Sequence, residues 1–370
     1  MPNISSLGGA AAAALLVAAC GAAGTPTIAP VGTGTPATPA GSVAAISTGA
    51  PTAAPTAAPT AAPTLTPTVQ GVTNGRIAYG VKSSAGSFNI FSVLPDGTDS
   101  KQLSTGAGNS LCAAYSADGK QIAYCGDASG QFEIWTMQAD GTKPTQVTHL
   151  NGRVLFPDFS PNGKKIVFAG AVAADANTDV YVVDSTTGEG LIALTSCKGK
   201  AGGCANDYPA WSPDGKHIVF VHQDDYVADK PVNEQIWLMN ADGSNQHALT
   251  TGSDPKDQLP SWSPDGKFIV YASGVGDNEG IWVMAADGSA QVQLTGCPPA
   301  DAAPCANGSD FGPVWSPDGT RIAFVRYFGA VGANDRPVYV MNADGTDQRR
   351  LSEGTSLDAV PAWQSIPTAG

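Results

Sequence analysis

The sequence predicts an all-β fold, a six-bladed β-propeller built from four-stranded antiparallel blades. The first observation is a recurring hairpin motif, which reads YPAWSPDGKHIVF from Tyr208 to Phe220: an apolar strand, a Pro-Asp-Gly turn and a second apolar strand. Its aromatic residue recurs at positions 115, 159, 211, 262 and 315. These steps of 44 to 53 residues are typical of propellers and solenoids.

The second observation is another hairpin that follows each copy of the first. Ile236–Gly243 reads IWLMNADG and leads to the short strand Ala248–Thr250. Matching segments begin at Ile90, Ile134, Val180, Ile281 and Val338. Asp-Gly suits such turns because glycine accepts a positive φ and aspartate bonds its own backbone. Each repeat therefore holds four short strands, the content of one propeller blade.

The third observation is an incomplete first repeat. Arg76–Tyr79 matches the second strand of a blade and residues 89–104 match the third and fourth, whereas the missing first strand occurs at the other end of the chain, as Val360–Trp363. We therefore expect the C-terminal strand to join the first blade and close the ring. The other five blades are expected near 109–148, 152–195, 206–250, 257–295 and 308–352, within a propeller domain that spans 75–366.

The N-terminal region predicts export. Leu7–Ala19 is an apolar run too short to span a bilayer and reads as the core of a signal peptide, residues 1–20. It ends Val17-Ala18-Ala19-Cys20, which resembles a bacterial lipobox; the resemblance implies cleavage before Cys20 and a lipid on its thiol. The alternative is an ordinary secretory signal with an incidental cysteine. Residues 21–74, rich in Ala, Thr and Pro, predict a disordered linker that holds the domain away from the membrane.

The charge and the cysteine content indicate which ligands the domain excludes and how its cysteines pair. The net charge of −13 belongs wholly to the chain from Arg76 onward, and such an acidic domain repels nucleic acid. With Cys20 set aside, the cysteines form three local pairs, and export permits disulfides. The pairs are Cys112 with Cys125, Cys197 with Cys204, and Cys297 with Cys305. The alternative is six buried, reduced thiols. Their spacing does not suit zinc, and we predict no metal or cofactor.

The repeat itself resembles a known family. WSPDGKxIxF, followed by IWxMxADG and LT, resembles the TolB-type, WD-repeat-like propeller repeat. The resemblance implies a β-propeller of the bacterial envelope. TolB proteins carry an α/β domain before the propeller, where this chain has the Pro/Thr linker, so we expect that domain to be absent.

Strand direction predicts where a binding site lies. The first strand of each blade runs toward its Asp-Gly turn and the second returns, so all these turns lie on one side, the turn face. The opposite loop face carries the longer, variable loops, where binding sites usually occur. Candidates in these loops are Asp224, Asp225, Tyr226, Arg326, Tyr327 and Phe328. Local loop packing is the alternative for them.

A second set of candidates begins the innermost strands. It comprises Asn206, Asp257, Asp310 and Asp358. We expect their polar side chains to ring the channel mouth, open to solvent, and to suit a basic group of a partner. The alternative is that each aspartate accepts hydrogen bonds within its own loop.

Catalytic motifs are sparse. No GxSxG elbow occurs, the four histidines lack metal-ligand spacing, and Asp175–Asp179 begins like a calcium loop but has Val180 at the glycine position. The sequence thus favours a monomeric, membrane-anchored, non-enzymatic module or scaffold that binds an envelope protein or peptide. The competing interpretations are a glycan- or peptide-processing lyase or hydrolase with its site at the channel mouth, and a structural spacer.

Overall fold

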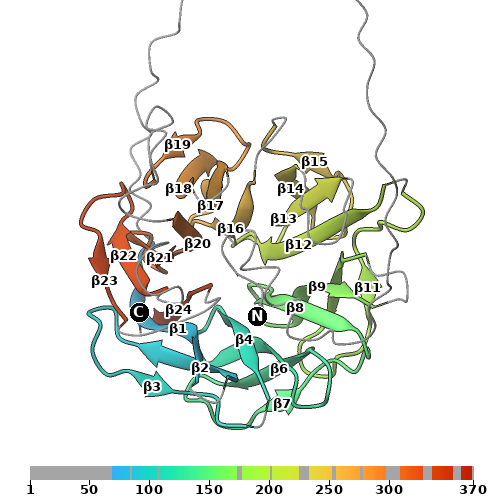
Figure 1. Cartoon of the computed structure of the whole chain (residues 1–370), viewed down its shortest axis with the longest axis horizontal. Helices are drawn as coiled ribbons and strands as arrows, with labels where there is room; N and C mark the ends of the chain where they lie inside the picture. The colour runs from blue at the N-terminus through green and yellow to red at the C-terminus, as the bar shows by residue number, and fades with distance from the viewer. Residues whose placement is uncertain are drawn as a thin grey trace, which may run out of the picture.

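The fold is a closed ring of β-sheets. The computed structural model describes residues 69–83, 86–106, 108–172, 177–200, 202–224, 233–251, 256–275, 278–296, 309–327, 336–352 and 360–368. Six four-stranded antiparallel sheets surround a central axis in this part of the chain (Figure 1). The predicted six-bladed propeller is therefore confirmed. The described residues contain no helix long and apolar enough to cross a membrane.

The blades follow one another around the ring in chain order, and the strands of each blade run from the innermost, at the axis, to the outermost. Blade 1 contains β24 (Ala362–Pro367), β1 (Val72–Lys82), β2 (Phe88–Val93) and β3 (Lys101–Gln102). Blade 2 contains β4 (Ser110–Tyr115), β5 (Gln121–Gly126), β6 (Glu133–Gln138) and β7 (Thr145–Gln146). Blade 3 contains β8 (Arg153–Phe159), β9 (Lys165–Ala171), β10 (Asp179–Asp184) and β11 (Ile192–Ala193).

The second half of the ring repeats this order. Blade 4 contains β12 (Cys204–Trp211), β13 (His217–Asp224), β14 (Glu234–Asn240) and β15 (His247–Ala248). Blade 5 contains β16 (Gln258–Trp262), β17 (Phe268–Val275), β18 (Asn278–Ala285) and β19 (Val292–Gln293). Blade 6 contains β20 (Ser309–Trp315), β21 (Arg321–Tyr327), β22 (Val338–Asn342) and β23 (Arg349–Arg350).

The recurring Ser-Pro-Asp-Gly motif forms the first turn of the blade. In blade 4, Ser212 Oγ donates to Asp214 Oδ1 at 2.7 Å and accepts the backbone N–H of His217 at 2.9 Å. Gly215 has a φ of 69°, a left-handed conformation that glycine adopts without strain. Blades 2, 3, 5 and 6 make the same serine-to-side-chain bond at 2.6–2.9 Å. The serine, the acidic or amide residue and the glycine of the motif therefore each have a role in the turn.

The serine or threonine that ends each repeat holds the second hairpin together. Its Oγ accepts a backbone N–H near the start of the third strand, at 2.8–3.0 Å in all six blades. The residues are Ser104, Thr148, Thr195, Thr250, Thr295 and Ser352. In blades 2 and 3 the threonine hydroxyl also donates to a buried carboxylate, that of Glu133 or Asp179. These contacts satisfy backbone groups that would be costly to bury unpaired.

The C-terminal strand closes the ring as predicted. β24 pairs antiparallel with β1, with Ile77 opposite Trp363 and Val72 opposite Pro367, so strands from the two ends of the chain lie side by side (Figure 1). The strand starts at Ala362 and extends beyond the predicted Val360–Trp363. Trp363 is 7% exposed and packs in one cluster with Ile77 of blade 1 and Val340 of blade 6. Closure is therefore both a hydrogen-bonded and an apolar contact.

Two of the three predicted cysteine pairs are disulfides. Cys112–Cys125 joins β4 to β5, and Cys197–Cys204 links the end of blade 3 to the start of blade 4, with Cα–Cα distances of 5.6 and 5.3 Å. Cys125 lies opposite Leu111, so the pair is offset by one residue. The sequence allowed this offset through a bulge at Gly119, but the bulge lies in β4 itself. Cys297 and Cys305 lie outside the described residues.

Ring closure gives the first prediction. Trp363→Ala should lower the free energy of unfolding by about 3–5 kcal/mol, because it removes a buried aromatic side chain from the contact between blades 1 and 6. Thermal unfolding followed by circular dichroism measures this. Ile366→Ala on the same strand is the control, since Ile366 is 44% exposed and should change stability little. Equal melting temperatures for the two variants would contradict the closure role of Trp363.

Candidate functional site

A cavity of about 280 Å³ lies on the propeller axis. Its wall comes from the innermost strand or the residues just before it in every blade, and it includes prolines from five blades: Pro157, Pro209, Pro260, Pro313 and Pro361. Pro213, from an Asp-Gly turn, also contributes, so the cavity extends toward the turn face. The propeller thus encloses a largely apolar site at its centre.

A repeated β-bulge shapes this wall. In blades 2 to 6 the innermost strand carries one extra residue relative to its neighbour, just before the aromatic end of the strand. The bulge contains a residue with a φ between 53° and 61°: Cys112, Phe156, Tyr208, Leu259 or Gly312. Four of these are not glycine, and such backbone strain often accompanies functional sites. The bulge brings Phe156 and Tyr208 into the wall with ring centroids 4.2 Å apart.

Asp158 is the one carboxylate among the residues that line the described cavity. Its Oδ2 accepts the backbone N–H of Trp211, in the next blade, at 2.7 Å. Burial raises the pKa of Asp158 to about 7, although hydrogen bonds from the Trp211 and Phe159 backbone oppose the shift. The lining residues include no Lys, Arg or His to offset the charge. An ionised Asp158 is therefore poorly stabilised within the protein.

The innermost-strand carboxylates predicted at an open channel mouth are buried instead. Asp257 and Asp310 are 4% and 1% exposed, and the Thr250 and Thr295 hydroxyls of the preceding blades hydrogen-bond them. Asp310 also receives two hydrogen bonds from Arg326, at 2.6 and 2.8 Å. The expectation of solvent-open carboxylates was wrong for both residues. These side chains satisfy hydroxyl donors where consecutive blades meet.

The loop residues of blade 6 are also less exposed than predicted. Arg326 pairs with Asp310, and its guanidinium carbon lies 4.9 Å from the Tyr339 ring centroid. Tyr327 is half-buried against the blade 1–blade 6 cluster, with Arg336 over its ring. Both side chains thus pack against neighbouring strands, and local packing is the alternative that the sequence left open for them. Asp225, Tyr226, Phe328 and Asp358 lie outside the described residues, as does Cys20.

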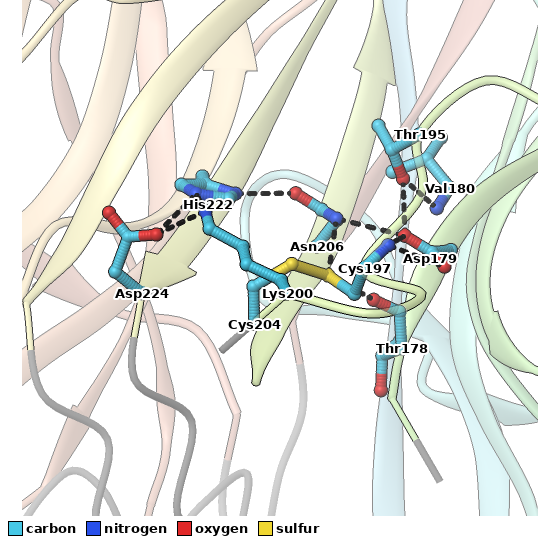
Figure 2. The surroundings of a disulfide bond; sticks show 10 residues. All are labelled: Thr178, Asp179, Val180, Thr195, Cys197, Lys200, Cys204, Asn206, His222 and Asp224. Atoms are coloured by element: carbon cyan, nitrogen blue, oxygen red, sulfur yellow. Dashed lines mark hydrogen bonds and ion pairs between the residues drawn. A yellow bond between two sulfur atoms is a disulfide. The ribbon is translucent and has the colours of Figure 1, made fainter. Parts of the chain in front are cut away.

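Asn206 and Asp224 meet in a polar cluster on the loop face, beside the Cys197–Cys204 disulfide (Figure 2). Asn206 Nδ2 donates to Asp179 Oδ1 at 3.0 Å, which leaves Asn206 Oδ1 as the acceptor for His222 Nδ1 at 2.7 Å. His222 Nε2 then accepts from the Lys200 ammonium at 3.2 Å, and Lys200 also pairs with Asp224. The bonds to Asn206 and Lys200 together suit a neutral His222 with its proton on Nδ1, and Nε2 also lies 3.2 Å from Asp224 Oδ1.

The cluster disfavours a charged imidazole. Burial, and next the Lys200 ammonium, lower the pKa of His222, while a hydrogen bond from Lys200 lowers that of Asp224. His222 is 8% exposed, and both of its ring nitrogens have partners. These bonds connect the segment that joins blades 3 and 4 to strand β13. Asp224, one of the binding candidates predicted on the loop face, keeps a partly exposed carboxylate.

Sequence reasoning missed Asp158, Lys200 and the bulge residues. The sequence did contain a signal for Asp158. The position before the recurring aromatic residue is small or apolar in the other blades, where it is Ala114, Ala210, Ser261, Val314 or Ala362, and it is acidic only at Asp158. The sequence contained no signal for Lys200, because its partners His222 and Asp224 come from a strand that the sequence alone does not place beside it. No group of three or more metal-ligating side chains occurs within the described ranges.

Comparison with known proteins agrees with the propeller fold. Residues 176–305 match the TolB beta propeller domain family. The repeats in this segment therefore resemble those of the TolB beta propeller domain. The uncharacterized protein Atu1656 of Agrobacterium fabrum is 30% identical over 152 residues, which cover 40% of this chain and 47% of that protein. The Tol-Pal system protein TolB of Anaeromyxobacter sp. is 28% identical over 132 residues, 35% of this chain and 26% of that protein. The chain thus spans less than half the length of these curated relatives.

Solved structures share the fold of this propeller. TolB from Acinetobacter baumannii aligns with a TM-score of 0.61 at 23% identity, over 78% of this chain and 66% of that one. The hydrazine synthase of Kuenenia stuttgartiensis aligns with a TM-score of 0.62 at 15% identity, over 80% and 47%. At these identities the likeness shows the fold alone, and an enzyme shares it, so function has to be argued from the site.

Asp158 gives the second prediction. Its folded-state pKa of about 7 lies above the ordinary value of 3.8, so protonation favours the folded state. The carboxyl group's stabilisation is complete below pH 4 and is lost as the pH rises through 7. Asp158→Asn cannot ionise and keeps an acceptor for the Trp211 N–H. At pH 8 it should therefore raise the free energy of unfolding, by on the order of 2–4 kcal/mol.

Thermal melts at two pH values test this. The gain from Asp158→Asn should vanish at pH 4, where the wild-type carboxyl is neutral. Asp214→Asn is the control with the opposite sign, because hydrogen bonds led by that from the Ser212 hydroxyl lower the pKa of Asp214. A gain of equal size at both pH values would show that the charge of Asp158 is not the cause.

Proposed function

We propose that this chain is an exported, membrane-anchored binding module whose propeller holds a protein or peptide partner of the bacterial envelope at the axial cavity. The observation that carries the proposal is the cavity wall, an apolar surface assembled from all six blades around one carboxylate. Concave, mostly apolar sites with a few placed polar groups are typical of binding pockets. The match to TolB-type repeats supports an envelope partner, since one of the two curated relatives is a Tol-Pal system protein.

The module acts without catalysis in this proposal. A glycan- or peptide-processing site needs an acid and a base, or a nucleophile with its base, within reach of one bond. Among the described lining residues, Asp158 stands without a second carboxylate or a histidine. This residue set suits the holding of a side chain better than bond cleavage. The partner reaches the cavity from the turn face, on which Pro213 lies. The partly exposed Asp224 remains a candidate for a contact on the loop face.

Site-specific photo-crosslinking in the cells that produce the protein tests this function. A benzophenone amino acid at Ser261, in the cavity wall, should give one adduct of defined mass. The same group at Thr145, on the outermost strand of blade 2, should give none. The Thr145 position controls for random collisions at the surface. Identical adduct patterns from the two positions would contradict binding at the axis.

The membrane anchor is a separate prediction. Cys20 follows an apolar run and small residues, the pattern that resembles a lipobox. Cys20→Ala should leave the protein unprocessed or move it from the detergent phase to the aqueous phase in a phase-partition assay of cell membranes. Ser5→Ala, outside the lipobox, is the control. Cleavage of Cys20→Ala at the wild-type position, together with wild-type detergent partitioning, would exclude a lipid on this residue.

A further inference from the structure

The six innermost strands differ at one position of the cavity wall. The residue before the aromatic end lines the cavity in every blade, and five of the six are small or apolar: Ala114, Ala210, Ser261, Val314 and Ala362. The sixth is Asp158. The wall is therefore close to sixfold in shape but carries its charge on blade 3 alone.

Aromatic rings lie in the same sector of the wall as this carboxylate. Phe156 is two residues before Asp158 on β8, and its ring packs against Tyr208 of β12. The Trp211 N–H that Asp158 accepts also belongs to β12. Blades 3 and 4 thus present a carboxylate and two aromatic rings to the cavity. An organic cation fits this combination, because the carboxylate attracts its charge and the rings attract both its charge and its carbon atoms.

We propose that the cavity is a subsite for a lysine side chain of the partner, whose ammonium pairs with Asp158 while its methylene groups pack on the prolines, Phe156 and Tyr208. This inference rests on the proposed function and adds the chemistry of the group that is recognised. A cavity of about 280 Å³ is at the small end for ligand pockets, a size for one side chain.

Two features favour lysine over arginine. Asp158 Oδ2 already accepts the Trp211 N–H, so the carboxylate is poorly placed for the two parallel bonds that a guanidinium makes. An ammonium is a compact charge on a flexible apolar stem and needs a single oxygen. The net charge of −13 also draws cations toward the domain from a distance. In the cavity, Asp158 then favours an ammonium over a guanidinium.

The test uses butylammonium, the equivalent of the lysine side chain, with the full-length protein at pH 8. Trp211, Trp262 and Trp363 line the cavity, so their fluorescence reports binding. Butylammonium should bind saturably, and 1-butanol and butylguanidinium should each bind about tenfold more weakly or worse. Asp158→Asn should weaken butylammonium binding by about tenfold or more while leaving the weak binding of 1-butanol unchanged. Equal affinities for the ammonium and the alcohol, or an unchanged affinity in Asp158→Asn, would overturn the proposal.

Asp207→Asn is the matched control. Asp207 lies on an innermost strand, and burial raises its pKa to about 6, yet it is not part of the cavity wall. This variant should bind butylammonium as the wild type does. An equal loss in both variants would assign the effect to the charge of the whole domain and overturn the assignment to Asp158.

Crosslinking separates this inference from the proposed function. With the benzophenone at Ser261, adding Asp158→Asn should reduce the partner adduct by about tenfold, in step with butylammonium binding. If the adduct persists while butylammonium binding is lost, the site takes a free amine and the partner's lysine is excluded. If no adduct forms from Ser261 in the wild type, the proposed function fails, and the butylammonium titration still decides whether Asp158 is an ammonium site.

Discussion

The pairing of β24 with β1 is the contact on which the rest of the molecule depends. It joins segments separated by most of the propeller sequence and places Trp363 between the first and last blades. The axial cavity exists because of it, since Pro361, Ala362 and Trp363 complete a wall that the other five blades leave open. Closure also leaves no blade without a partner on either side, so apolar clusters continue around the ring. Fold and site are thus products of the same contact.

The fold could be predicted from the sequence because its determinants are local and repeated. Each Ser-Pro-Asp-Gly turn is stabilised by its own serine and its own acidic or amide side chain. The Ser or Thr that ends each repeat accepts a hydrogen bond from a backbone N–H 14 or 15 residues earlier. Five copies of the turn and six of the final Ser or Thr reveal the period of the repeat and the number of strands. The first strand of blade 1 could also be found in the sequence, because Pro361–Trp363 repeats the Pro-Ala-Trp of Pro209–Trp211 in blade 4.

The site could be predicted less well, and the bulge explains why. One extra residue in the innermost strand breaks the strict alternation of side chains, so counting from the strand start does not show which residues reach the axis. Asp257 and Asp310 precede the bulge, and their placement at the channel mouth failed for another reason: threonine hydroxyls of the preceding blades, which the sequence does not place beside them, bind them in the interior. Asp158 lies beyond the bulge and lines the cavity. Its environment depends on Trp211, a residue of the next blade.

The prolines of the wall restrict how a partner can be recognised. The innermost strand of a blade has one free edge, which in other sheets can accept an added strand from a second protein. Proline has no N–H to donate, and it stands in this edge or immediately before it in five of the six blades. An extended peptide that enters the axis thus finds too few donors to continue any of these sheets. Under the proposed function, a partner is therefore held through an inserted side chain rather than through an added strand.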